Sequence, residues 1–237
     1  MTLSSPGGVT VSKEPRDLTW FWGWLAFLGV MVALGMVFLY APTERIMGDI
    51  QRIFYFHVAS AWNGFLAFAV VFVYSIIYLR TGSRKADIVA YSSAEIGVLF
   101  TTIVLLTGPI WARISWNTWW TWDPRLTTTL ILWFIYLAYL VIRASAEGSE
   151  QQARFAAVFG IIGFVDVPIV WVAARWWRSI HPTLTEGTKM RMEPPMVATL
   201  IVSVLAFTVL YLFFLSARTR IERLGQEVFE FKQSLRG

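Results

Sequence analysis

The chain has 237 residues, of which 57% are hydrophobic and 15% charged, and its formal net charge is +5. This composition leaves too little polar surface to cover a soluble globule of this size. The absence of cysteine excludes disulfides, thiolate metal sites, iron–sulfur clusters and thiol catalysis within the chain. The predicted fold class is all-α, a polytopic membrane bundle, and nothing in the charge implies nucleic acid binding.

Residues 1–19 are polar and contain prolines and glycines, which is typical of a disordered tail. The apolar run that follows, 20–40, carries no charge and is long enough to span a bilayer but too long for a cleaved signal core. Five further runs have spanning length or nearly so: about 53–79, 88–111, 126–142, 155–177 and 196–217. The sequence therefore predicts a domain of six transmembrane helices over 20–217.

An even number of spans places both termini on one side, together with the loops near 80–87 and 143–154. These segments hold the larger share of the lysines and arginines, so the positive-inside rule predicts that they are cytoplasmic. We therefore expect a multi-pass protein of the inner (cytoplasmic) membrane. The charged and apolar residues of 218–237 predict a cytoplasmic amphipathic helix, which either docks a partner or only solubilises the chain.

The most distinctive motif lies in the predicted outer loop, 111–125. It holds five of the thirteen tryptophans and closes on an Asp-Pro-Arg triplet: Trp111, Trp116, Trp119, Trp120, Trp122, Asp123, Pro124 and Arg125. Because tryptophan offers a large flat apolar face and a single donor, so dense a patch suits a large, flat, apolar ligand. The alternative is an aromatic belt at the membrane surface.

The chain has two histidines, and the predicted topology puts both on the outer side. His57 lies where the second span begins, and His181 follows the end of the fifth. Two neutral imidazoles that approach from opposite faces are the ligand set of a six-coordinate heme iron, so we predict a bis-histidine heme site. The alternative for each histidine is a structural role.

A heme also brings two propionates, and the bidentate fork of arginine holds a carboxylate well. Four arginines flank the predicted site: Arg52, Arg125, Arg175 and Arg178. Each could instead be an interface arginine that reaches the lipid headgroups. Asp123 either orients an indole N–H, pairs with Arg125 or caps the fourth helix, whose first turn tolerates Pro124.

Two carboxylates, Glu95 and Asp166, fall within predicted spans. A charged group in the bilayer is costly, so each is expected to face the protein interior and to contact a neighbouring helix or subunit. Pro168, two residues after Asp166, is expected to kink the fifth span.

The segment from Trp116 to Thr127 resembles the signature of the WWD-domain family of cytochrome c maturation proteins, which has CcmC and CcsA branches. At six spans the chain is most similar to the CcmC branch, and the resemblance extends from Arg52 through the sixth span. It implies that heme b is bound without a covalent link, between His57 and His181 as axial ligands. The loop side chains that would cradle the heme edge are Trp116, Trp119, Trp120 and Trp122.

The resemblance also implies partners. These are a membrane-tethered heme chaperone, CcmE, which receives heme on the outer face, the small membrane protein CcmD, and the ATP-driven transporter formed by CcmA and CcmB. The chain itself has no Walker motif, so ATP hydrolysis would come from such a partner. Two residues depart from the family pattern. Asn117 stands where glycine is usual, and Ala59 stands where proline is frequent; asparagine tolerates the left-handed conformation and could preserve a turn.

Three functions fit these features. The first, and the one favoured by a surface loop that a partner can reach, is a heme-binding transfer protein without catalytic residues. The second is a bis-histidine b-type cytochrome that keeps its heme for electron transfer, although two histidines on one side allow only one heme. The third is a heme-free transporter with a structural tryptophan belt, which would leave the paired histidines unexplained.

Overall fold

The computed structural model describes residues 18–145, 150–177, 179, 181, 185–186, 189–190 and 192–235. Nearly all of its regular structure is helical. The elements in chain order are α1 (Thr19–Gly35), a π turn η1 (Met36–Tyr40), a 3₁₀ turn η2 (Asp49–Arg52), α2 (Ile53–Thr81), α3 (Arg84–Trp116), α4 (Pro124–Ala144), α5 (Glu150–Phe164), α6 (Asp166–Trp176), β1 (Thr185–Glu186), β2 (Lys189–Met190) and α7 (Pro194–Ser234).

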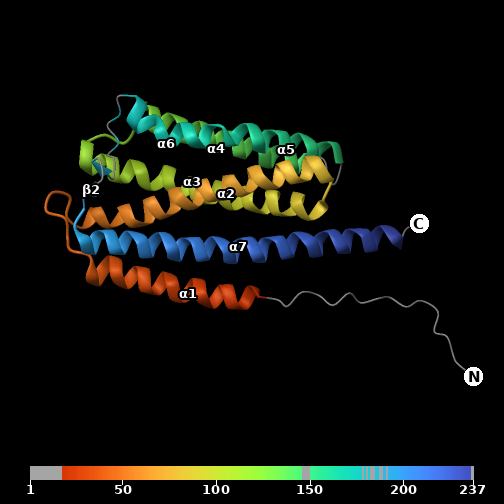
Figure 1. The fold of residues 1–237 in the computed structure, drawn as a ribbon, viewed down its shortest axis with the longest axis horizontal. Helices are drawn as coiled ribbons and strands as arrows, with labels where there is room; N and C mark the ends of the chain where they lie inside the picture. The colour runs from red at the N-terminus through yellow and green to blue at the C-terminus, as the bar shows by residue number, and fades with distance from the viewer. Residues whose placement is uncertain are drawn as a thin grey trace, which may run out of the picture.

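Six helical segments are long and apolar enough to cross a membrane. They are Thr19–Tyr40, Asp49–Thr81, Arg84–Trp116, Pro124–Ala144, Glu150–Trp176 and Pro194–Ser234. The predicted all-α fold with six spans is confirmed. In Figure 1 the helices lie side by side; α1 begins and α7 ends toward one end of the bundle, and the connections around β2 lie at the other. The paired strands β1 and β2 are two residues each and form a small antiparallel ladder.

The fifth span is broken in the middle. α5 ends at Phe164 and α6 begins at Asp166, with Val165 between them. Pro168 lies in the first turn of α6, where its missing N–H costs no hydrogen bond within the new helix, but it cannot donate to Phe164 as a continuous helix would require. The expected distortion of this span is therefore present as a break between two shorter helices.

The sixth span and the charged stretch after it form one helix. α7 runs without interruption from Pro194 to Ser234, so no break marks the expected boundary at 217–218. Beyond the bundle its apolar side chains Ile221, Leu224 and Val228 are exposed. Arg218 and Glu222 form an ion pair one turn apart, with 2.9 Å between Nη1 and Oε2, which supports the helix as it leaves the apolar segment.

The core lies between α2, α3, α4 and α5. The Phe68 and Tyr136 rings stack with centroids 3.7 Å apart, and both side chains are fully buried. This stack requires glycine on α3, because a Cβ on Gly97 would lie only 2.4 Å from a ring carbon of Phe68. α1 packs mainly on α7, and α6 packs mainly on α4.

The tryptophan-rich segment 111–125 is called the tryptophan loop below. Ion pairs join the helices at the end of the bundle opposite this loop. Arg143 of α4 contacts Asp87 of α3, with 2.9 Å between Nη2 and Oδ2. Arg218 of α7 contacts Glu95 of α3 through Nε and Oε2 at 2.6 Å. Both guanidinium groups also lie over the ring of Tyr91. The expected contact of Glu95 with a neighbouring helix is therefore present.

Asp166 behaves differently from Glu95. Its Oδ2 atom is buried and has no hydrogen-bond partner among the described residues. The side chain thus faces the protein, as expected of a carboxylate within a span, but the polar contact expected for it is not formed by that oxygen.

Candidate ligand-binding site

A cavity of about 520 Å³ opens at the end of the bundle that carries the tryptophan loop. Side chains from α2, α3, α4, α6 and α7 line it, together with Trp120 of the α3–α4 loop and His181. Its volume falls in the range of roughly 300 to 1,000 Å³ that is typical of small-molecule and cofactor pockets. The described lining is mostly aromatic and aliphatic, contains no acidic residue, and includes both histidines of the chain.

His57 enters the cavity from the second turn of α2 and leans against α3. Its Nδ1 lies 2.9 Å from Oγ1 of Thr107, and its Cε1 lies 3.4 Å from where a Cβ on Gly108 would be. The Thr107 hydroxyl donates to the carbonyl of Ile103 at 2.7 Å, so its oxygen accepts from Nδ1–H of His57. This assignment leaves Nε2 without a proton and available as a ligand.

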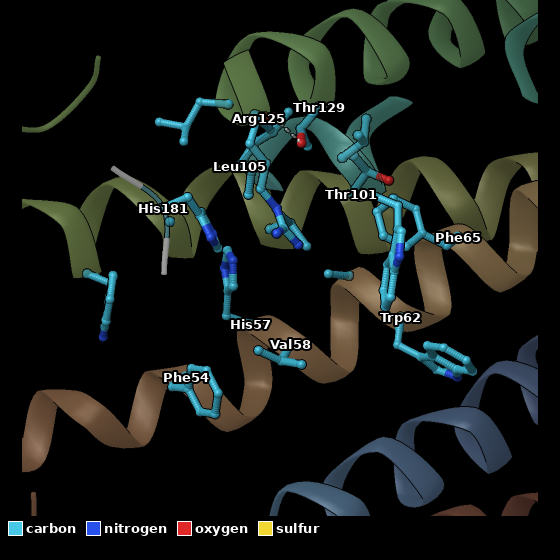
Figure 2. A pocket seen from close by; sticks show the side chains of 18 of the residues that line it. Phe54, His57, Val58, Trp62, Phe65, Thr101, Leu105, Arg125, Thr129 and His181 are labelled. Atoms are coloured by element: carbon cyan, nitrogen blue, oxygen red, sulfur yellow. Dashed lines mark hydrogen bonds between the residues drawn. The ribbon is translucent and has the colours of Figure 1, made fainter. Parts of the chain in front are cut away.

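His181 lies in the connection after α6 and is tied to the tryptophan loop. Its backbone N–H donates to Oγ of Ser179 at 3.0 Å, and that hydroxyl donates to Oδ1 of Asp123 at 3.0 Å. The rings of His181 and Trp116 also meet in an edge-type contact, with centroids 6.4 Å apart. In Figure 2 the imidazoles of His57 and His181 point toward one another inside the cavity.

The structure divides the tryptophans of the motif into two groups. Trp111, Trp116 and Trp120 line the cavity, and the first two meet edge to face with centroids 5.2 Å apart. Trp119 and Trp122 are not part of the lining; they are 60% and 76% exposed. Of the four tryptophans expected to cradle the ligand edge, Trp116 and Trp120 are therefore brought to the cavity, whereas the other two stand on the surface beside it.

The turn that orients this loop depends on Asn117. It is the one described non-glycine residue with positive φ, at 54°, and it ends α3 in the left-handed conformation. Nη1 of Arg113 donates to both the backbone and side-chain oxygens of Asn117, at 2.8 and 2.6 Å. Asn117 therefore adopts the left-handed conformation that asparagine was expected to tolerate here.

The loop closes on the N-terminus of α4. Asp123 is its N-cap and accepts from the backbone N–H of Arg125 at 2.9 Å, and Pro124 occupies the first turn. Asp123 is thus a helix cap, one of the expected roles, and also the acceptor that holds Ser179. Ala59, the other departure from the family pattern, is fully buried in α2, and its carbonyl accepts from Asn63.

Two of the four expected arginines belong to the cavity. Arg125 and Arg175 are part of its lining, and Figure 2 shows Arg125 on the wall opposite Phe54 and Val58. Arg52 is not in the lining. Its guanidinium contacts Asp49, Thr43 and the carbonyl of Val37, so it holds the connection between α1 and α2. Arg178 lies outside the described residues.

Thr107 and Ser179 are site residues that the sequence did not reveal. Thr107 is far from His57 along the chain, and a threonine inside an apolar helix more often bonds only to its own backbone. Ser179 lies close to His181, but only the fold brings it to Asp123. Trp111 has a further property, since its Nε1 is buried at the cavity and has no hydrogen-bond partner among the described residues.

The fold and this cavity together define a polytopic helical membrane protein with an apolar, imidazole-bearing ligand cavity at one end of its bundle. The sequence signature of the family described as heme exporter protein C matches residues 3–233. The chain therefore belongs to the heme exporter protein C family, a transport or transfer component of cytochrome c maturation. The resemblance drawn from the tryptophan segment is confirmed.

Individual relatives support the same family membership. The heme exporter protein C of Haemophilus influenzae is 32% identical over 205 residues, which cover 86% of this chain and 82% of that protein. Its counterpart from Escherichia coli K12 is 32% identical over 194 residues, or 81% of this chain and 79% of the relative. A putative cytochrome c biosynthesis ccmC-like mitochondrial protein of Marchantia polymorpha is 35% identical over 159 residues, which is 67% of each chain.

Proposed function

We propose that this protein binds heme b without a covalent link in the cavity, with His57 and His181 as axial ligands, and passes it to a membrane-tethered heme chaperone of the CcmE type. The observation that carries the proposal is that the only two histidines of the chain line one apolar cavity. A flat macrocycle suits a cavity lined by two imidazoles and tryptophan rings, because both its faces and most of its edge are apolar.

The polar groups of the cavity fit the rest of a heme. Arg125 and Arg175 are the charged residues of the described lining, and they suit the two propionates. Nε1 of Trp111, which has no partner among the described residues, adds a buried donor, and a buried donor without an acceptor is costly unless a ligand satisfies it. Thr107 fixes the ring of His57 so that Nε2 is the atom presented to iron.

Release to an acceptor suits the position of the cavity. The loop that forms its outer wall also exposes Trp119 and Trp122, two flat apolar side chains on which an acceptor protein could dock. The side chains of this protein need no covalent chemistry, since they hold iron by ligation and the macrocycle by contact. Work from ATP would come from a CcmA/CcmB-type transporter, and a CcmD-type small membrane protein would complete the complex.

The distribution of cationic residues supports an orientation of the protein in the membrane. The end with the Asp87–Arg143 and Glu95–Arg218 pairs is the end where α7 terminates, and the cationic connections between the spans lie there. We infer that this end is cytoplasmic and that the cavity and both histidines face outward from the inner membrane.

The test is the visible spectrum and heme content of the detergent-purified protein after expression with ample heme. Wild type should carry low-spin heme, and the His57→Ala, His181→Ala double variant should lose most of it. Trp20→Ala is the matched control, because Trp20 is an exposed aromatic residue of α1 outside the cavity lining, and it should keep wild-type heme content.

Two results would count against the proposal. Unchanged heme content in both single histidine variants would refute the ligand assignment. Heme that stays on the wild-type protein when a CcmE-type chaperone is added would favour a b-type cytochrome that keeps its heme.

A further inference from the structure

The cavity is deep as well as open at the tryptophan loop. His57 meets α3 at Gly108, and the lining continues along α3 to Thr101. Those seven residues correspond to about 10 Å of helix, a third of the roughly 30 Å hydrocarbon core of a bilayer. On α2 the lining likewise continues from His57 to Phe65. The inner part of the cavity therefore lies at the depth of lipid tails.

One side of this inner part carries exposed side chains. Four of its lining side chains are also 47 to 59% exposed: Trp62 of α2, Trp171 of α6, and Ile201 and Leu205 of α7. An exposed side chain at this depth of a membrane-spanning helix faces hydrocarbon, so these residues contact the cavity and the bilayer at once.

The two walls beside this region belong to different parts of the bundle. α6 packs on α4 and α5, whereas α7 packs on α1, α2 and α3. The polar contacts of α7 also run toward α3, through Tyr211 and Ser93 and through Arg218 and Glu95. At the outer end, in contrast, Asp123, Ser179 and His181 are joined by hydrogen bonds that hold the loop segments together.

The distribution of charge in the lining matches a ligand that arrives from lipid. The two lining arginines come from the outer ends of their helices, Arg125 from the first turn of α4 and Arg175 from the last turn of α6. The described lining of the inner half carries no charge. An amphiphile in a bilayer keeps its carboxylates near the headgroups and its apolar edge among the lipid tails. The cavity has the same arrangement, with its arginines at the outer end and its uncharged lining further in.

We infer that the cavity opens sideways to the bilayer between α6 and α7, and that heme enters through this opening from the outer half of the membrane. The inference rests on the proposed heme function and assigns the route by which that site is filled. A macrocycle already in lipid moves into an apolar chamber without being exposed to water and without turning over.

The absence of native cysteine makes the opening testable. Trp171→Cys with Leu205→Cys places one thiol on each side of it, and a short, reducible bifunctional thiol reagent then bridges α6 to α7. Ile201→Cys with Leu205→Cys is the matched control, since both residues line the cavity and are exposed but lie on α7 alone. The reagent then modifies the same region without closing it.

The measured quantity is the initial rate at which low-spin heme appears when proteoliposomes are mixed with heme-loaded lipid vesicles. The bridged α6–α7 pair should take up heme about tenfold more slowly than the control pair, and reduction of the bridge should restore the rate. When the bridge is formed after loading, the heme content should be unchanged, which separates a closed route from a damaged site.

Equal rates for the two bridged pairs would overturn the side opening. Because loss of Trp171 could itself disturb the site, Leu205→Phe provides a second variant that only narrows the opening. It should slow the initial rate of uptake by about threefold, as expected of a narrowed gate; a wild-type rate in this variant would also contradict the inference. The wild-type protein without a bridge tests the proposed function alone. If it binds heme, it must take up heme whatever the route of entry.

Discussion

Thr107 shows how a single side chain can decide what a histidine offers. The hydroxyl donates to the carbonyl of Ile103 and accepts from Nδ1 of His57, so the tautomer of the ring with an unprotonated Nε2 is favoured, as the proposed iron ligation requires. A neutral hydroxyl orients the ring without making it anionic, which suits the proposed role of His57 as a ligand of a heme that is passed on.

Replacing this hydroxyl tests that role. Thr107→Val keeps the shape and removes the acceptor, so heme affinity should fall by about 10- to 100-fold, the range found for outer partners of metal-binding histidines. Heme titration followed by absorption measures it, and the low-spin bands should shift or broaden in the variant. Thr107→Ser should restore both affinity and bands. A valine variant with wild-type affinity and spectrum would mean that Thr107 does not position His57.

At the scale of elements, the end of α3 is set by backbone conformation rather than by hydrophobicity. Asn117 reverses the chain in the left-handed region, and Arg113 bonds to its two oxygens. The next residues then form the wall of the cavity and the cap of α4. Asparagine at this position is thereby compatible with a left-handed turn.

Substitution at Asn117 should test whether the backbone conformation of this residue sets the end of α3. Asn117→Gly should be nearly neutral because glycine adopts positive φ freely, whereas Asn117→Val should lower the free energy of unfolding by about 1 to 2 kcal/mol. Thermal unfolding in detergent measures both variants, with Ile114→Val, an exposed position of the same helix, as the control. Equal stability of the glycine and valine variants would show that the turn imposes no such restraint.

The elements differ in how far the sequence could predict them. Six spans follow from hydropathy, because backbone in lipid must be helical. The ends of the helices do not follow from hydropathy. A hydrophobic run ends at the first charged residues, whereas α7 continues to Ser234 and is supported there by pairs such as Arg218 with Glu222. His57, Trp116 and Arg125 could be predicted as site residues from their chemistry. The partition of the tryptophans, and the roles of Thr107 and Ser179, could not, because they depend on contacts between distant segments.

Across the whole molecule the two ends of the bundle are held together differently. The end where α7 terminates is joined by charged side chains of α3, α4 and α7 around Tyr91. The opposite end surrounds an apolar cavity and is closed mainly by loop hydrogen bonds. The helices are thus fixed relative to one another at one end and leave room for a ligand at the other.

Loss of the charged contact should weaken the fold and spare the site. Arg218→Met leaves Glu95 without its cation in a partly buried position, and the free energy of unfolding should fall by about 1 to 3 kcal/mol. The Arg218→Met, Glu95→Gln double variant should recover part of that loss, because Glu222 is then the only one of the two carboxylates left without its arginine. Thermal unfolding measures stability, and heme content should match wild type in both variants. If the Arg218→Met variant folds but loses heme, the charged end of the bundle is not independent of the cavity, contrary to this prediction.

That both histidines of the chain face one cavity also gives the protein a built-in probe. Isotopic labelling of histidine alone would confine the imidazole signals of a 237-residue membrane protein to two rings, both at the site. Each ring nitrogen would report its own proton or its own metal bond, so filling and emptying of the cavity become visible atom by atom, without a tag and without interference from the rest of the chain.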